Sequence, residues 1–428
     1  MLKMTDIQPI GMDIGHDSVR MLQLDAKGNT LTACSAAARR LQIADGAAGN
    51  KGEQSLAAAM NVAADMLKDG GFIGRSVAVA LPREIVHIKN LRLPMIPVAE
   101  LPAAIAFEAR NIFPFDTDTA HIEFLHAGEV RQGSDARQEV IVLAAKHADV
   151  DAFVERLDRI GLRVASLDAE PCAIYRSLER FIRRRDDEQE VNVILDMGLR
   201  RTQVLIGRGR EISFFKPIDI GGHRLNDAVS KRLNITLEEA RSLRWRLAES
   251  DGGNVAEAQD AVRQAVFHAV RGPLEELGRE VSLCLRYHSV TFRGPGPARV
   301  RLAGGEAHDP HTAQVLRSIL SIPVEAAQPL YNVDGLAMKP PDSEWATALG
   351  LALKKTTGRF AAKDGRPRAT RPGLGEVIDL NQAVAGASDG KPSLGDSKPS
   401  SPEGRFSLAD GKLPSIDSKP SPPEVARA

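Results

Sequence analysis

Two similar patterns of apolar and polar positions occur far apart along the chain. Near the N-terminus, the apolar run at residues 9–12 leads into Asp-Ile-Gly at residues 13–15, and apolar residues resume at 19–24. In the second half, residues 191–198 end in Asp-Met-Gly and are followed by the apolar run at 203–206. Short apolar runs bounded by turn residues are typical of strands. Each pattern therefore predicts a β-hairpin whose turn contains an aspartate and a glycine.

Further strands and helices are expected between the two hairpins. Leu56, Met60 and Leu67 recur at helical spacing, whereas the Val-Ala-Val run after Ser76 is typical of a buried strand. Residues 131–137 are polar and are expected to form a loop. The strands are predicted at 30–40, 76–81, 85–91, 121–126, 139–145 and 164–168, and the helices at 52–67, 102–112, 149–160 and 171–184.

The second half of the chain continues the alternation and adds longer helices. A strand at 212–220 ends at Gly221-Gly222, and a later strand at 300–302 leads into Gly304-Gly305. Thr236 is a plausible N-cap for the helix that follows it. Helices are predicted at 223–233, 236–247, 312–320 and 345–354, a strand at 324–326, and one or two helices at 255–291, with Pro273 marking a start or a kink.

The composition changes beyond about residue 357, where Pro, Gly, Ser, Lys and Asp dominate. Residues 396–403 recur almost unchanged at 417–424. Because so few apolar side chains can be buried there, we expect residues 357–428 to be a disordered tail. One short apolar segment, Val-Ile-Asp-Leu at residues 377–380, interrupts it. This segment is either a docking peptide or a chance cluster within a linker.

Length and charge narrow the possible classes of protein. A chain of 428 residues is long enough for two or three domains, and its 56 basic and 56 acidic residues give no net field for nucleic acid or a membrane surface. The three cysteines have no metal-ligand spacing, which favours buried thiols in a reducing compartment. The N-terminus does not resemble a signal peptide, and no apolar run approaches the ~18 residues of a membrane span. We expect a soluble cytoplasmic protein that reaches a membrane only through partners.

The two hairpins also carry candidate chemistry. Backbone N–H groups in an Asp-x-Gly turn can approach a phosphate, and the carboxylate can hold Mg²⁺ through its waters. A glycine pair between a strand and a helix, such as Gly304-Gly305, lets the backbone lie flat against an adenosine. Two such hairpins in one chain predict two similar halves that close on a phosphate-bearing ligand.

These elements resemble the actin-like superfamily, which includes sugar kinases and heat-shock ATPases, and within it the PilM family of type IV pilus assembly. The resemblance spans roughly residues 8–355. Its most specific part is similar to the segment that forms the family's inserted 1C subdomain. The matching residues are Leu93-Pro94-Met95-Ile96-Pro97, Glu100-Leu101, Ala104-Ile105, Glu108 and Ile112-Phe113-Pro114-Phe115.

The resemblance implies an α/β, two-lobed actin-like (ribonuclease-H-like) ATPase fold with a 1C-type insert and a disordered C-terminal tail. Lobe 1 would span residues 1–185, with the 1C subdomain at about 84–150. Lobe 2 would span residues 186–356, with a helical 2B subdomain at about 226–295, and the tail would follow at 357–428.

The resemblance also implies an ATP site with Mg²⁺ held by Asp13 and Asp196. The implied nucleotide-binding residues are Asp13, Gly15, His16, Ser18, Arg20, Asp196, Gly198, Thr202, Gly221, Gly222, Arg244, Gly304, Gly305 and Glu306. Several positions depart from the family pattern. His16 replaces a serine, Arg20 a lysine and Arg241 an acid expected at the ribose, while Glu306 adds charge and bulk where a small residue is usual. We therefore expect nucleotide binding with little or no hydrolysis, and no residue is assigned a catalytic role.

The implied function is a cytoplasmic scaffold, recruited to the inner face of the inner membrane, that binds the N-terminal cytoplasmic peptide of a PilN-like inner-membrane protein. The family's peptide groove lies between subdomains 1A and 1C, which places it near residues 84–116 here. Two alternatives remain open at this point. One is a phosphotransferase of the sugar-kinase type, and the other is a polymerising actin-like cytoskeletal protein.

Overall fold

The structure is a computed structural model that describes most of the chain up to residue 354. It describes residues 6–27, 30–41, 51–132, 135–182, 184, 187–249, 257–293, 295–336, 342–354 and 378–379. The predicted disorder of residues 357–428 lies outside the described residues, apart from 378–379. Among the described helices, none combines the length and the apolar character that crossing a bilayer requires.

Two of the three sheets have the same topology. The first has the order β14-β3-β2-β1-β4-β8, and the second has the order β11-β10-β9-β12-β13. The first sheet comprises β1 (Ile10–Ile14), β2 (Ser18–Lys27), β3 (Thr30–Arg40), β4 (Ser76–Ala80), β8 (Arg163–Asp168) and β14 (Val333–Asp334). The second comprises β9 (Val191–Met197), β10 (Thr202–Arg208), β11 (Glu211–Ile218), β12 (Val300–Ala303) and β13 (Val324–Ala326).

Strand direction makes the repeat explicit. Strand β1 pairs antiparallel with β2 and parallel with β4, while β9 pairs antiparallel with β10 and parallel with β12. Both hairpins predicted from the Asp-x-Gly patterns are therefore confirmed, and each opens an equivalent sheet. Because β1 and β9 occupy equivalent central positions, their carboxyl ends bring Asp13 and Asp196 to equivalent places.

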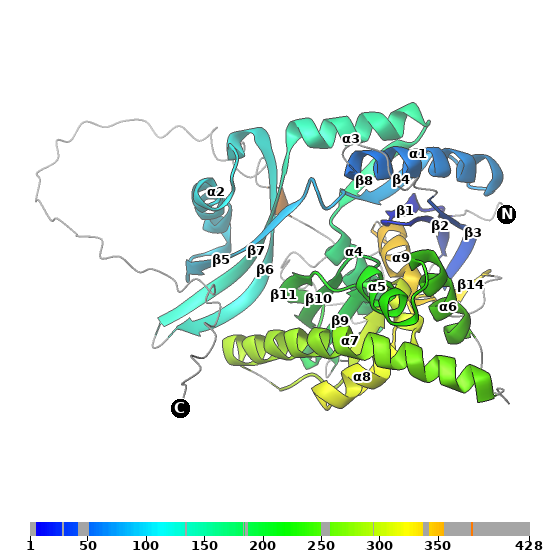
Figure 1. Ribbon diagram of the computed structural model, residues 1–428. Helices are drawn as coiled ribbons and strands as arrows, with labels where there is room; N and C mark the ends of the chain where they lie inside the picture. The colour runs from blue at the N-terminus through cyan, green and yellow to red at the C-terminus, as the bar shows by residue number, and fades with distance from the viewer. Residues whose placement is uncertain are drawn as a thin grey trace, which may run out of the picture. The chain divides into compact units, whose positions relative to one another are not determined.

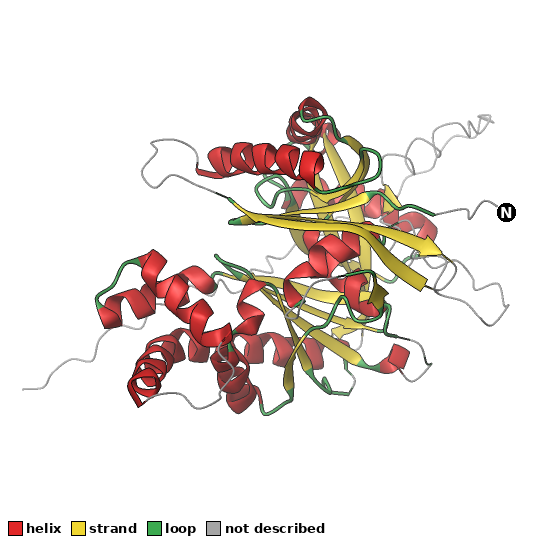
Figure 2. Cartoon of the chain, turned by 90° about the vertical axis from the view of Figure 1, so that its right-hand side faces the viewer, coloured by secondary structure: helices red, strands yellow, loops and turns green. Residues whose placement is uncertain are grey.

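Helices cover both faces of these sheets (Figure 1, Figure 2). Helices α1 and α3 pack on one face of the first sheet, and α9 packs on the other. Helices α5, α7 and α8 cover the outer face of the second sheet, and α4 packs on its inner face. The helices are α1 (Lys51–Asp69), α2 (Leu101–Ile112), α3 (His147–Arg159), α4 (Glu170–Glu179), α5 (Gly222–Leu233), α6 (Leu237–Glu249), α7 (Glu257–Phe292), α8 (Pro310–Leu320) and α9 (Ala346–Ala352).

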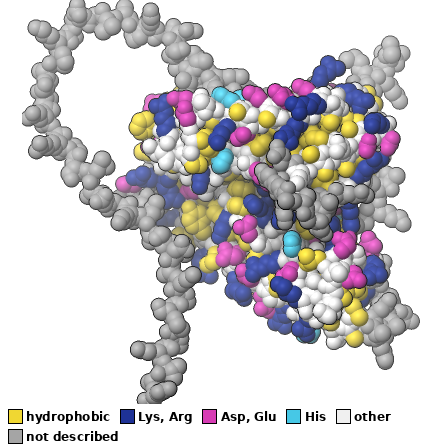
Figure 3. Space-filling model, turned by 45° about the horizontal axis from the view of Figure 1, so that its top comes forward, with side chains coloured by type: hydrophobic (Ala, Val, Ile, Leu, Met, Phe, Trp, Pro, Cys, Tyr) yellow, Lys and Arg dark blue, Asp and Glu magenta, His cyan; other side chains and the backbone are white. Residues whose placement is uncertain are grey.

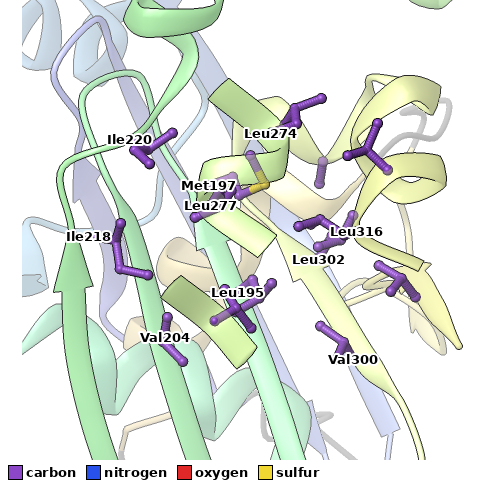
Figure 4. Close-up of a cluster of buried hydrophobic side chains, with 14 of the residues drawn as sticks. Leu195, Met197, Val204, Ile218, Ile220, Leu274, Leu277, Val300, Leu302 and Leu316 are labelled. Atoms are coloured by element: carbon purple, nitrogen blue, oxygen red, sulfur yellow. The ribbon is translucent and has the colours of Figure 1, made fainter. Parts of the chain in front are cut away.

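The core of the second half shows how the strand pattern becomes packing. Alternate residues Leu195 and Met197 of β9 point to the face covered by α7 and α8, where they meet Leu277 and Leu316 (Figure 4). All four side chains are fully buried. Burial of each such side chain contributes roughly 1.5–3 kcal/mol relative to exposure. This packing fixes β9, and with it the position of Asp196.

A third sheet, with the order β15-β6-β7-β5, is the expected insert. Its strands are β5 (His87–Pro94), β6 (Ala120–Gln132), β7 (Asp135–Lys146) and β15 (Ile378–Asp379). Helix α2 packs against it through Leu101, Ile105 and Ala109. These three residues follow one face of the helix, so the opposite face is left to solvent.

Two predictions of element length are wrong. The polar loop expected at residues 131–137 belongs mostly to β6 and β7, because Val130 and Arg131 continue the ladder with Arg137 and Ala136. Backbone pairing there does not need an apolar pattern. Helix α4 ends at Glu179, before the predicted 184, because the following amides of Phe181 and Ile182 bond three residues back. Of the one or two helices predicted at 255–291, the structure has one, which spans residues 257–292 and continues through Pro273.

Basic and acidic side chains are interspersed on the face of the molecule drawn in Figure 3. Several charged side chains of the described residues form exposed ion pairs, such as Arg224 with Glu276 at 2.7 Å. Such pairs contribute about 0–1 kcal/mol each because water screens them. The charged groups that shape the molecule's chemistry are instead those buried in the cleft described below.

Candidate nucleotide cleft

A cavity of about 760 Å³ lies between the two equivalent sheets. Its lining includes Asp13 at the end of β1, Asp196 at the end of β9 and Gly304 directly after β12. Arg83 and Glu170, which follow β4 and β8, line it as well. The volume is within the usual range for small-molecule sites, roughly 300–1,000 Å³. The cavity therefore has the size and the position expected for a ligand between two halves.

The two aspartates of the hairpins are both buried in this cavity. Burial raises the pKa of Asp13 to about 7, although Arg20 nearby opposes the shift. Burial likewise raises the pKa of Asp196 to about 6, and Glu170 adds to the effect. The charge of Asp196 also raises the pKa of Asp13, because the two carboxylates lie in one cavity. Two buried carboxylates with raised pKa values are electrostatically unfavourable in their ionised form without a cation, and they are suited to hold one.

The turn after β12 approaches Asp196 closely. Gly304 has φ of +85°, and a Cβ atom built there would lie 2.5 Å from the Met197 carbonyl oxygen. The same atom would lie 2.8 Å from Oδ1 of Asp196. Only glycine fits both the backbone conformation and the space. The turn thus leaves a flat backbone surface beside the carboxylate, as a planar ligand requires.

Arg20 on β2 links the first hairpin to the start of α9. Its guanidinium lies 3.7 Å from Oδ2 of Asp13, donates to Oγ of Ser18 at 3.0 Å and pairs with Glu344. The Nε of Arg20 is buried without a partner. An arginine with an unused donor beside a cavity is suited to an anionic group.

Arg83 and Glu170 form an ion pair at the cavity wall that the sequence analysis did not anticipate. Both Nε and Nη2 of Arg83 approach Oε2 of Glu170, at 2.8 and 2.7 Å. Strands β1, β4 and β8 are parallel, so residues that follow them meet at one edge of the sheet. Arg83 lies three residues after the end of β4 and Glu170 lies two residues after the end of β8, so a charged residue shortly after each strand was the available signal.

Two contacts cross the cleft between the first hairpin sheet and α6. Arg241 of α6 pairs with Asp17 in the β1–β2 turn. One turn further along α6, Trp245 lies under the guanidinium of Arg40, with 5.5 Å between the guanidinium carbon and the ring centroid. All four residues line the cavity. The two halves are thus joined at the cavity mouth by side chains of this protein.

Helix α6 is fixed at its start by a capping box. The side chain of Thr236 accepts a bond from the amide of Glu239 at 3.2 Å, and the carboxylate of Glu239 accepts one from the amide of Thr236 at 2.8 Å. The predicted N-cap is therefore confirmed. This start sets the rotation of α6, which turns Arg241 and Arg244 toward the cleft side.

Arg244 organises a buried cluster behind the glycine turn. Its guanidinium donates to Oδ1 of Asn226 at 2.7 Å, to Oε2 of Glu306 at 2.7 Å and to Oδ2 of Asp309 at 2.8 Å. Glu306 therefore does not bring an uncompensated negative charge to the cleft, as its position in the sequence had indicated. Asp309 also caps α8 by accepting from the amide of His311.

The structure brings most of the predicted residues to the cavity wall. Those that line it are Asp13, Gly15, His16, Ser18, Arg20, Asp196, Gly198, Gly304, Gly305 and Glu306. His16 is half-buried, and burial together with Arg83 and Arg200 lowers its pKa.

Four of the predicted residues do not line the cavity. Thr202 is fully buried, and its hydroxyl donates to the Ile220 carbonyl at 2.7 Å. The amide of Gly222 donates to the Gly198 carbonyl at 3.0 Å, so Gly221 and Gly222 support the second turn from behind. Arg244 acts through Glu306, as described above. Within the described residues, no group of three or more His, Cys, Asp or Glu side chains is arranged to hold a metal.

Comparison with known proteins places this geometry in a family. Residues 11–356 match the family described as type IV pilus assembly protein PilM. No curated protein matches the chain in a sequence comparison. Among solved structures, a PilM–PilN type IV pilus biogenesis complex is similar, with a TM-score of 0.64, 21% identity and coverage of 82% of this chain and 98% of that chain.

More distant solved structures are also similar in part. The ethanolamine utilization protein EutJ from Carboxydothermus hydrogenoformans has a TM-score of 0.47 and 15% identity, with 81% of this chain and 89% of that chain covered. The MreB5 protein of Spiroplasma citri bound to ADP has a TM-score of 0.42 and 11% identity, with 83% and 98% covered. The family match spans most of the chain and agrees with the paired sheets, the insert and the central cleft. The chain has the two-lobed actin-like fold and belongs to the PilM family of type IV pilus assembly proteins.

Proposed function

We propose that this protein is a cytoplasmic scaffold of type IV pilus assembly that binds ATP between its lobes and captures a peptide from a membrane partner. The partner peptide is the N-terminal cytoplasmic segment of a PilN-like inner-membrane protein, which recruits the scaffold to the inner face of that membrane. The observation that carries the proposal is the meeting of Asp13 and Asp196 in one cavity of a PilM-family chain.

The cavity suits a nucleotide bound with Mg²⁺. Asp13 and Asp196 would hold the cation through its waters, and the cation would neutralise the phosphate charge. Gly15 and Ser18 of the first turn and Gly198 of the second would approach the phosphates, with Arg20 beside them. The adenosine would lie against the Gly304-Gly305 backbone.

The ionic state of the cavity supports binding rather than rapid hydrolysis. Three of the four glutamates that line the cavity, Glu170, Glu306 and Glu344, are each paired with an arginine. A guanidinium that donates to a carboxylate occupies the oxygens that a general base would use. Hydrolysis is therefore expected to be slow or absent in the isolated protein.

Peptide capture would use the third sheet and α2. Phe107 on the outer face of α2 is 67% exposed, and Met95 and Val98 just before the helix are exposed as well. Large exposed apolar side chains gathered on one element mark interaction surfaces. A peptide seated there would combine main-chain bonds with apolar contacts. In a solved structure of similar fold, the complex itself is between PilM and PilN.

Calorimetric titration of the full-length protein with ATP, with and without Mg²⁺, tests the nucleotide half of the proposal. We expect saturable binding that needs Mg²⁺ and that weakens tenfold or more, about 1.4 kcal/mol or more, in D13N and D196N. The exposed Asp151→Asn in α3 is the matched control. The partner's N-terminal peptide is then titrated into the protein with and without ATP and Mg²⁺. If titration of ATP into the wild-type protein gives no binding heat, the proposed ATP binding is wrong and only the proposed peptide capture remains.

A further inference from the structure

Strand β6 has one edge that β7 does not cover. Residues Ala120 to Gln132 pair antiparallel with β7 along the whole strand. On the opposite edge, the backbone pairing found within the described residues is with β15 alone, where Ile378 lies opposite Phe124 and Asp379 lies opposite Glu123. Such an edge presents a row of main-chain donors and acceptors that another extended segment can join.

The segment that joins this edge comes from the C-terminal tail. Residues 377–380 read Val-Ile-Asp-Leu, which places two β-branched residues and a leucine within four positions. β-Branched residues favour strands, whereas the Pro, Gly, Ser and Lys that surround the segment do not. The apolar segment singled out in the sequence is thus the one that forms β15 beside β6 (Figure 1, orange).

We propose that the tail strand β15, Ile378–Asp379, is a built-in occupant of the β6 edge that competes with an extended peptide from a membrane partner. The inference rests on the proposed function, because it assigns the competing ligand to peptide capture at the same sheet. The ligand class that fits is an extended, aliphatic peptide that pairs antiparallel with β6. When the partner peptide binds, β15 leaves the edge.

The linker that precedes the segment allows this arrangement. Helix α9 ends at Ala352, so about 25 residues separate it from Ile378. A segment tethered at this separation in sequence has an effective concentration in the millimolar range. A short strand with a millimolar intrinsic dissociation constant would therefore occupy the edge for much of the time. A partner peptide that binds more tightly would displace it.

Two proline substitutions in the full-length chain test the pairing between β15 and β6, one at the paired strand and one elsewhere in the tail. I378P removes an amide and breaks strand geometry at the paired position. Ile416→Pro is the matched control, because Ile416-Asp417 repeats the Ile-Asp dipeptide elsewhere in the tail. Hydrogen exchange of β6 amides near Phe124 is the first readout and needs no partner. We expect exchange to be roughly 2- to 10-fold faster in I378P than in wild type and I416P, given a millimolar effective concentration.

A labelled synthetic peptide of residues 374–383 is the second probe. It should bind I378P more tightly than wild type by a similar factor, since the cis competitor is weakened. The partner's N-terminal peptide should compete with it. Equal β6 exchange and equal peptide affinity in all three proteins would overturn the cis pairing. If exchange differs as expected but the partner's peptide neither binds nor competes, the tail pairing stands and the assignment of partner capture to this edge falls.

Discussion

Arg241 on α6 pairs with Asp17 in the turn between β1 and β2, across the cleft that separates the two halves of the fold. Their side chains are 19% and 28% exposed, so water reaches the pair and limits its strength. Both residues line the cavity where phosphates would lie. The pair therefore joins the two sides of the cleft, and an anion that entered the cavity would compete with Asp17 for Arg241.

We expect D17N to raise the affinity for ATP with Mg²⁺ by about fivefold, because a partly exposed ion pair contributes up to about 1 kcal/mol. The substitution removes a negative charge beside the phosphates and frees Arg241 to meet them. R241Q should lower the affinity by a comparable factor. The measurement is calorimetric titration, with the exposed Arg246→Gln on the same helix as control. Unchanged affinity in both cleft variants would place the nucleotide away from this pair.

The contribution of Asp13 and Asp196 to the stability of the ligand-free protein should fall as pH rises from about 4 to about 7. Burial raises the pKa of Asp13 to about 7 and that of Asp196 to about 6, whereas both would ionise near 3.8 when unfolded. In that window the unfolded chain has lost protons that the folded chain still holds, so the slope of unfolding free energy with pH is negative. Above about pH 7 this contribution is flat. Mg²⁺ needs the ionised carboxylates, so its affinity should rise through the same window.

D13N tests this electrostatic assignment directly. It replaces a buried acid that must ionise with a neutral amide, so the ligand-free protein should gain about 1–2 kcal/mol of unfolding free energy at pH 8. The gain should vanish near pH 4, where the wild-type acid is protonated in both states. Urea unfolding at the two pH values measures it. A variant less stable than wild type at pH 8 would show that Asp13 is ionised and compensated in the free protein.

Arg244→Met should destabilise the protein by about 3–5 kcal/mol, because it leaves Glu306 and Asp309 buried and unpaired. The side chain of Arg244 is only 4% exposed, so water cannot replace the lost donors. Chemical denaturation measures the loss. Arg246→Met, two positions along the same helix and exposed, should change stability by less than about 0.5 kcal/mol. Similar effects of the two substitutions would contradict the role of the buried cluster.

Gly350 allows α9 to approach α4 closely. A Cβ atom at Gly350 would lie 1.7 Å from the Ala173 carbonyl oxygen of α4. We expect G350A to cost more than about 3 kcal/mol, since the α4 and α9 backbones must separate. Thermal melts of wild type and G350A provide the comparison, and a variant as stable as wild type would contradict the close approach.

The hairpins were predictable because their signals are local. An apolar run, Asp-x-Gly and a second run specify strand, turn and strand over some fifteen residues, and the structure has both hairpins at the expected places. The boundaries of β6 and β7 were not predictable, because their distal pairs rest on backbone bonds between polar residues. The hydrophobic pattern of a sequence does not indicate how far strand pairing extends beyond the buried core.

The charge state of the cleft was not predictable from positions in the sequence. In the sequence, Glu306 is an added negative charge near the nucleotide site. In the structure, Arg244, 62 positions earlier, pairs with it. In the sequence, Arg241 is the loss of a hydrogen-bond acceptor. In the structure, it pairs with Asp17, 224 positions away. Thr202 follows the expected pattern, yet its hydroxyl is used inside the fold. Pairing between distant segments depends on how the sheets and helices pack. A single sequence does not contain that information in readable form.

The central claim is most directly tested by the affinity of a fluorescent N-terminal cytoplasmic peptide of the PilN-like partner for the full-length protein, measured by anisotropy. We expect saturable binding that weakens tenfold or more, about 1.4 kcal/mol or more, in Phe107→Ala. Leu283→Ala, an exposed apolar residue on α7, is the matched control and should bind as wild type does. Wild-type protein that fails to bind the peptide, with or without ATP and Mg²⁺, would contradict the account.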